Sequence, residues 1–220
     1  MILAVVSGKG GVGKSTLSFE LGAALDAVVV DADLGMANLP YAPGPDLHDV
    51  LSGRAEPVEA VREGGPVTLL PCGRSLVGAR SADVRKLAAT LRSVEAAYGD
   101  VVVDCPAGMR ADAGVPLAVA DACLIVASPK GYALADAVRT RELARELDCG
   151  LVAVAVNRVI DDAPLDAFAD VLGAPATAIP ADPKLGRAIE QVNPVVARAP
   201  NCLASARIQE LASAVTACRL

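Results

Sequence analysis

The sequence predicts an α/β fold, in a single domain that spans residues 1–220, with a mostly parallel sheet and helices on both faces. Short apolar runs rich in valine, such as residues 27–30 and 101–103, have the length and β-branched composition of buried strands. Longer segments with apolar residues at three- and four-residue spacing alternate with these runs. Strands that alternate with helices favour a parallel sheet covered on both faces, and no linker-like stretch divides the chain.

The first predicted strand, residues 2–6, is followed directly by a glycine-rich loop and then by a helix with regularly spaced leucines. The loop matches the pattern G-x-x-x-x-G-K-[ST] from Gly8 to Ser15, in which backbone N–H groups and the helix N-terminus bind phosphate oxygens. We therefore predict a P-loop NTPase in which Lys14 contacts the β and γ phosphates and the Ser15 hydroxyl binds Mg²⁺. The predicted nucleotide-binding residues of this loop are Gly8, Lys9, Gly10, Gly11, Val12, Gly13, Lys14, Ser15 and Thr16.

Charge and composition argue against several other functions. The net charge of -6 disfavours non-specific DNA binding, which depends on neutralising phosphates. Aromatic residues make up only 2% of the chain, which leaves few rings for stacking on bases. The six cysteines form no C-x-x-C pair, as is typical of a reducing cytoplasm.

Neither a membrane span nor a signal peptide is predicted. The longest nearly apolar run, residues 115–127, is too short to cross a bilayer and is interrupted by Pro116 and Asp121. The apolar run at residues 2–6 has no basic residues before it and leads straight into the phosphate loop. We therefore expect a cytoplasmic protein that reaches a membrane or polar structure, if at all, through a partner.

Two further predicted strands end in carboxylates. The run at residues 27–30 leads into Asp31 and Asp33, and the run at 101–103 leads into Asp104. In open α/β sheets ligands bind at the carboxyl ends of the strands, so these side chains should face the phosphates. An aspartate at a strand end beside a phosphate loop is the Walker B arrangement, which binds Mg²⁺ directly or through water.

The rest of the chain continues the alternation of strands and helices. The only histidine, His48, has no partner pattern for catalysis, so we expect it to serve packing or to lie at the surface. The expected order is a short helix capped by Asp46, a strand at 67–71, a loop at 74–80, a helix at 83–98, a strand at 122–127, a helix at 132–147, a strand at 151–156, a strand end at 177–183, and helices at 184–191 and 202–216.

A second lysine, Lys9, makes the loop read Lys-Gly-Gly-Val-Gly-Lys-Ser-Thr, which resembles the deviant Walker A motif of the MinD/ParA family of P-loop ATPases. The pair Asp31 and Asp33, with Asn38 five residues later, resembles the first switch of the MinD-like branch. Asp104-x-Pro106-Ala107-Gly108 resembles its second switch. Asn157-Arg158 and Ile179-Pro180-x-Asp182 resemble the segments that surround the base. These matches run in the family's order over nearly the whole chain.

The resemblance implies an ATP-binding and ATP-hydrolysing switch with Mg²⁺, slow and stimulated by a partner. Lys9 would cross a dimer interface to the partner's nucleotide, and Asp33 would orient the attacking water, so the implied catalytic residues are Lys9, Lys14 and Asp33. Ser15, Asp31 and Asp104 would serve the metal. The Gly108 N–H would bind the γ-phosphate, and Asn157 would read adenine. The implied switch residues are Asp31, Asp33, Asn38, Pro106 and Gly108, and the implied base pocket comprises Asn157, Arg158, Pro180 and Asp182.

The implied partners are a second copy of the chain when ATP is bound and an unidentified regulator or cargo in division, motility or partitioning of chromosomes or plasmids. Arg110 stands where bacterial MinD proteins usually carry an acidic residue. Those proteins also continue into a basic amphipathic segment that binds lipid. Here only Arg207 and Arg219 are basic in the corresponding stretch, so we expect no such anchor.

Three alternatives stay open on the sequence alone. The first is an ATP-dependent metabolic enzyme of the same superfamily, such as a synthetase that activates carboxylates. The second is an iron–sulfur relative, in which Cys72 and Cys105 are the candidate ligands across a dimer axis. The third is a scaffold that binds ATP without turning it over.

Overall fold

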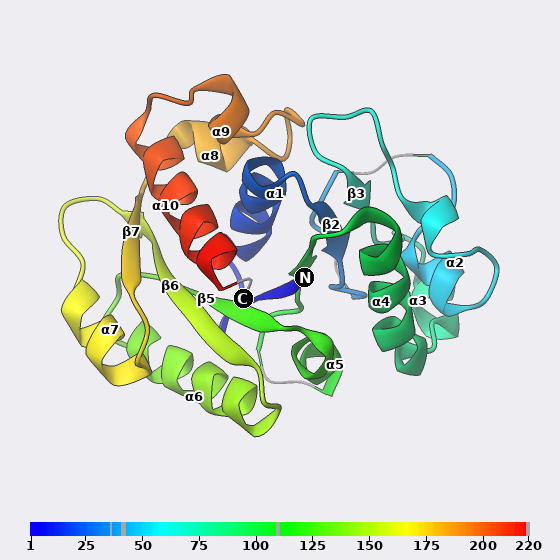
Figure 1. Ribbon diagram of the computed structural model, residues 1–220, viewed down its shortest axis with the longest axis horizontal. Coiled ribbons are helices and arrows are strands. Elements are labelled where there is room, and N and C mark those ends of the chain that lie inside the picture. The colour runs from blue at the N-terminus through cyan, green and yellow to red at the C-terminus, as the bar shows by residue number, and fades with distance from the viewer. Residues whose placement is uncertain (36, 41–42, 109–110, 219–220) are drawn as a thin grey trace.

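The computed structural model describes residues 1–35, 37–40, 43–108 and 111–218. Its centre is a seven-stranded sheet in the order β3-β2-β4-β1-β5-β6-β7, and every pair of neighbouring strands is parallel (Figure 1). The predicted fold class is confirmed. The strands are β1 (Ile2–Val6), β2 (Val28–Asp31), β3 (Leu69–Leu70), β4 (Val101–Asp104), β5 (Ala122–Ala127), β6 (Gly150–Val159) and β7 (Ala176–Pro180).

Helices cover both faces of the sheet (Figure 1). One face carries α1 (Lys14–Leu25), α8 (Pro183–Arg187), α9 (Val195–Arg198) and α10 (Leu203–Ala217). The other carries α2 (Leu47–Leu51), α4 (Leu87–Tyr98), α5 (Ala111–Val119), α6 (Ala133–Glu146) and α7 (Leu165–Leu172), and α3 (Leu76–Ser81) packs on α2.

The central strand explains why the sheet is buried on both sides. Ile2, Ala4 and Val6 belong to the hydrophobic cluster on one face, and Leu3 and Val5 belong to the cluster on the other. Successive side chains of a strand point to opposite faces, so a strand covered on both faces is apolar at every position. The sheet is therefore a rigid support for the loops at its carboxyl edge.

Most predicted elements are confirmed, and their differences have local causes. The prediction of a loop at 74–80 is wrong. Helix α3 begins after Ser75, which caps it by accepting the Gly78 N–H on its hydroxyl at 3.3 Å. Leu76 and Val77 are 77% and 75% exposed, so this helix has no buried stripe for a periodicity argument to detect. The expected helix at 83–98 starts with a 3₁₀ turn (Val84–Lys86), and the one expected at 184–191 ends at Arg187.

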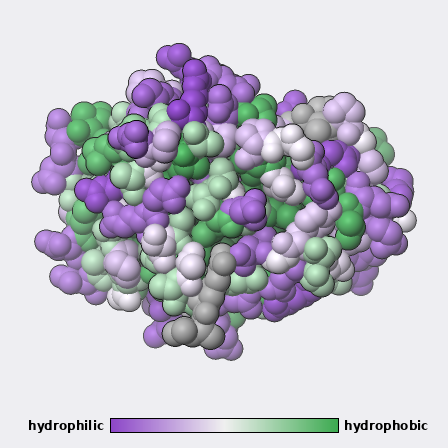
Figure 2. Space-filling view, turned by 45° about the horizontal axis from the view of Figure 1, so that its top comes forward, coloured by the Kyte–Doolittle hydropathy of each residue, from purple (hydrophilic) through white to green (hydrophobic). Residues whose placement is uncertain are grey.

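Hydrophilic residues cover most of the face seen in Figure 2, and hydrophobic residues lie between them in smaller groups. Within the described part of the chain, no helix has both the length and the apolar character needed to cross a bilayer.

Candidate nucleotide-binding site

The carboxyl ends of β1, β2 and β4 border a cavity of about 520 Å³, here named the phosphate cavity. The glycine loop between β1 and α1 forms one wall, and the segments that follow β2 and β4 form the other. Among its lining residues are Gly10, Gly11, Gly13, Lys14, Ser15, Thr16, Asp33, Asn38 and Pro106. The structure thus brings the predicted phosphate loop and both predicted switches to one place.

Gly13 shows why the loop needs glycine. Its φ is 94°, in the left-handed region, and a Cβ at this position would collide with the Nδ2 atom of Asn157. The absence of a side chain lets the loop lie against the end of β6. The N-terminus of α1 begins immediately afterwards and directs its N–H groups at the phosphate cavity.

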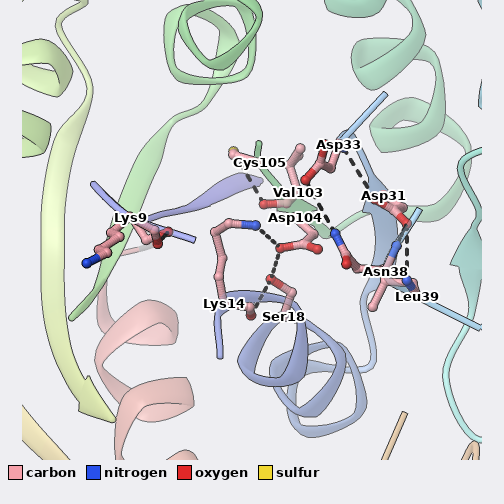
Figure 3. Close-up of polar contacts among 11 residues, drawn as sticks. Lys9, Lys14, Ser18, Asp31, Asp33, Asn38, Leu39, Val103, Asp104 and Cys105 are labelled. Carbon is pink, nitrogen blue, oxygen red and sulfur yellow. Dashed lines mark hydrogen bonds and ion pairs between the residues drawn. The ribbon is translucent and has the colours of Figure 1, made fainter. Parts of the chain in front are cut away.

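Lys14 lies against the carboxylate at the end of β4 (Figure 3). Its Nζ is 2.7 Å from Asp104 Oδ1, and the Ser18 hydroxyl donates to the same oxygen at 3.2 Å. Both members of the ion pair are buried, with relative side-chain exposures of 7% and 0%. Breaking such a pair leaves an uncompensated buried charge, so Lys14 leaves Asp104 readily only when other charges replace it.

The two strand-terminal aspartates are direct neighbours in the sheet, with Asp31 in register with Asp104. Asp31 accepts backbone N–H groups of Asn38 and Leu39 at 3.0 and 3.2 Å. Burial, together with the nearby negative charge of Asp104, raises the pKa of Asp31 to about 7 despite these hydrogen bonds. Two carboxylates in so small a buried space favour the arrival of a cation.

These residues fit Mg²⁺ and a polyphosphate. Among the described residues, Asp104 Oδ2 is one of the few buried side-chain atoms that lack a hydrogen-bond partner. Carboxylate and hydroxyl oxygens are the ligands that Mg²⁺ prefers, usually one or two carboxylates together with substrate phosphates. Ser15, which lines the cavity, and the fully buried Asp104 and Asp31 offer that donor set, and Lys14 with the loop N–H groups offers the phosphate contacts.

The first switch segment is held together by its own polar groups. The Asn38 side chain donates to Asp33 Oδ2 at 3.3 Å, while its backbone N–H is bonded to Asp31 (Figure 3). Asp33 is half-buried and lines the phosphate cavity. The structure therefore places Asp33 where a carboxylate can face the end of a bound triphosphate.

The second switch is bonded to the phosphate loop. Gly108, with φ 88°, donates its N–H to the Ser7 carbonyl oxygen at 3.0 Å. The N–H that the resemblance assigns to the γ-phosphate is thus engaged within the chain in this structure. Pro106 is buried and lines the cavity. Arg110, the departure from the MinD pattern, lies outside the described residues.

Lys9 lies apart from the other site residues. It is exposed, and its side chain points away from Lys14 and the carboxylates (Figure 3). Its Nζ is 4.9 Å from the centroid of the Tyr132 ring. The structure does not bring Lys9 into its own protomer's phosphate cavity.

The predicted base pocket corresponds to a second cavity, of about 440 Å³, lined by Asn157, Arg158, Pro180 and Asp182 among others. Asn157 lies within β6 and donates from Nδ2 to the Val12 carbonyl at 2.8 Å, so its amide is bonded to the phosphate loop. Asp182 caps α8 by accepting the Lys184 N–H at 2.8 Å. Arg158 adopts a positive φ of 64°, an uncommon conformation that turns the chain beside both cavities.

Sequence reasoning missed two buried polar residues of α1. Ser18 donates a hydrogen bond to Asp104. Its spacing could have predicted a place in the site, since Ser18 lies four residues after Lys14 on the same helical face. Glu20 accepts the N–H groups of Val195 and Val196 at 2.8 and 3.0 Å, and burial raises its pKa. Glu20 thereby fixes α9 to the helix that carries Lys14.

Cys72 and Cys105, the candidate cluster ligands, are both buried inside the protomer. Burial raises the pKa of both thiols, which disfavours the thiolate form that binds iron. Ligation across a dimer axis needs outward-facing cysteines, so the iron–sulfur alternative loses its support.

The family model described as the CobQ/CobB/MinD/ParA nucleotide binding domain matches residues 3–195. The chain belongs to this family. An uncharacterised ATP-binding protein of Methanocaldococcus jannaschii is 31% identical over 96% of this chain and 86% of its own length. The crystal structure of the cell division ATPase MinD of Pyrococcus furiosus superposes with a TM-score of 0.91, at 30% identity, over 98% of each chain.

A second archaeal structure of the family carries a ligand. The septum site-determining protein MinD of Pyrococcus horikoshii, in complex with Mg-ADP, has a TM-score of 0.89 and 29% identity, over 97% of this chain and 95% of that one. The resemblance to the MinD/ParA ATPases that the motifs indicated is confirmed.

Proposed function

We propose that this chain binds ATP with Mg²⁺ in the phosphate cavity, hydrolyses it, and changes its association state with the nucleotide. The observation that carries the proposal is the buried contact of Lys14 with Asp104, beside Asp31 and open to the cavity that Asp33 lines. Family membership and the Mg-ADP complex of the Pyrococcus horikoshii protein support the choice of ligand. We infer that residues 1–220 act as one ATPase domain, since both core clusters pack on one sheet.

The residues have distinct tasks in this proposal. Lys14 exchanges its 2.7 Å contact with Asp104 for the β and γ phosphates, which leaves Asp104, still bonded to Ser18 through Oδ1, able to turn its charge toward the cation. Mg²⁺ held by Asp104, Asp31 and Ser15 would supply positive charge that offsets the negative charge of the phosphates. Asp33 orients the attacking water, while Asn38 holds the Asp33 carboxylate. Gly108 exchanges the Ser7 carbonyl for a γ-phosphate oxygen, so its loop responds to hydrolysis.

Lys9 is assigned to the neighbouring protomer's nucleotide. It is exposed and stands apart from its own Asp104, so it is free to face a second copy of the chain. A switch from mostly monomer to mostly dimer needs about 5 kcal/mol of differential binding. Several charge-assisted hydrogen bonds to a γ-phosphate are sufficient for that.

The output of such a switch is the recruitment or positioning of cellular machinery by one of its two states. The relatives' roles in cell division favour this class over a metabolic synthetase, as does the absence of a dedicated substrate insertion in the sequence. A scaffold that binds ATP without cleaving it shares every residue described above and differs only in turnover.

Light scattering of the purified chain with ADP and with a non-hydrolysable ATP analogue, both with Mg²⁺, tests the proposal. We expect monomers with ADP and dimers with the analogue. Lys9→Ala should stay monomeric with the analogue because the contact across the interface is gone, whereas the control Lys86→Ala, which removes an exposed lysine remote from the phosphate loop, should dimerise. The same mass with both nucleotides would contradict the switch.

A further inference from the structure

The only histidine of the chain is a buried link to the first switch. His48 lies on α2 with 2% exposure, and its Nε2 is 3.1 Å from the carbonyl oxygen of Leu34. Leu34 directly follows Asp33. Because a carbonyl oxygen can only accept, this contact requires Nε2 to carry the proton and donate it.

The imidazole is closely surrounded by other parts of the chain. Cys72 Sγ lies 3.4 Å from Nε2. On the other side of the ring, a Cβ at Gly73 would collide with Nδ1, and one at Gly78 would lie 3.0 Å from it. Two glycines thus let the backbone before and within α3 close over the ring.

The helix that carries His48 is itself fixed at its start. Asp46 and Asp49 form a reciprocal capping box, in which Asp46 accepts the Asp49 N–H at 3.1 Å and Asp49 accepts the Asp46 N–H at 3.2 Å. Leu47 and Leu51 are fully buried in the core beneath. The donor that meets Leu34 therefore sits on an element with little freedom to move.

We propose that His48 is a positioning residue for ATP hydrolysis: by fixing the Leu34 carbonyl, it holds Asp33 at the orientation that directs water at the γ-phosphate. This inference rests on the proposed function. Asp33 stands on an irregular segment after β2, where a carboxylate has no regular backbone ladder to orient it. A displacement of about 1 Å in a reacting group costs up to 100-fold in rate, so an anchor one residue away has a measurable effect.

The test compares His48→Leu, which removes the donor and keeps similar volume, with His48→Gln, which keeps an N–H donor at comparable reach. Val50→Ala is the matched control, since Val50 is buried on the same helix and its side chain belongs to the core. Steady-state ATP hydrolysis, ATP affinity and thermal unfolding are measured for all. We expect His48→Leu to lower kcat about 10-fold or more with ATP affinity within about 2-fold, and His48→Gln to recover most of kcat.

Three outcomes would overturn the inference and leave His48 a purely structural residue. They are wild-type kcat in His48→Leu, no recovery of kcat in His48→Gln, and a loss of kcat in Val50→Ala as large as that in His48→Leu. We expect Val50→Ala to lose stability with kcat unchanged. If His48→Leu does not fold, Gly78→Ala, which presses on the ring, should lower kcat instead, and wild-type kcat there would count against the link. A wild-type protein that binds ATP without cleaving it would refute the proposed function itself and this inference with it.

Discussion

Lys14→Met is expected to lower the affinity for Mg-ATP at least about 100-fold, because it removes a charge-assisted contact to the phosphates and leaves two buried carboxylates facing them. The same change should lower the free energy of unfolding by about 3–5 kcal/mol, since Asp104 loses its buried partner. Calorimetric titration with Mg-ATP and urea unfolding measure the two effects.

A double variant separates the two effects of Lys14. Adding Asp104→Asn to Lys14→Met removes the uncompensated charge, so much of the lost stability should return while nucleotide binding stays absent. Recovery of binding in the double variant would show that Lys14 acts only by neutralising Asp104, contrary to its assignment to the phosphates.

Asp33→Ala is expected to reduce ATP hydrolysis by about 10² to 10⁴-fold while ATP affinity changes little, because Asp33 would act on the water and not on ground-state binding. Asp33 lines the phosphate cavity, and its carboxylate accepts a hydrogen bond from the Asn38 side chain. Single-turnover hydrolysis and nucleotide titration measure the two quantities.

Asp33→Asn refines this assignment, since the amide keeps an oxygen that can accept from Asn38 and loses the negative charge. We expect it to be nearly as slow as Asp33→Ala. A loss of affinity as large as the loss of rate would instead place Asp33 among the ligands of the ground-state nucleotide.

The sequence allowed correct prediction of where the candidate site residues at the ends of strands lie. Asp31 and Asp104 follow buried valine runs, and parallel pairing places such ends at one edge, so their proximity to Lys14 follows from fold class and motif alone. The order of motifs also indicated the family, because glycines, lysines and aspartates at fixed spacing have a direct physical task.

What escaped prediction depends on contacts between segments far apart in the chain. Glu20 bonds to residues 195–196, and His48 meets Leu34 and Cys72, and neither pairing leaves a periodic signal. The hydrogen bonds of Asn157 to Val12 and of Gly108 to Ser7 were likewise not predictable. The motifs describe the contacts that these residues make with a nucleotide, not the contacts that they make within the chain. Helix α3 was missed because its apolar residues are exposed.

The central claim is that Lys9 acts on the nucleotide of the opposite protomer. Mixing Lys9→Ala with Asp33→Ala tests it most directly, because each variant alone should be inactive. In a mixed dimer, the site of the Lys9→Ala protomer has its own Asp33 and receives Lys9 from its partner. The account predicts that hydrolysis rises above the sum of the separate rates, because one of the two sites in each mixed dimer combines Asp33 with Lys9 of the partner. A rate equal to that sum at every mixing ratio and concentration would contradict it.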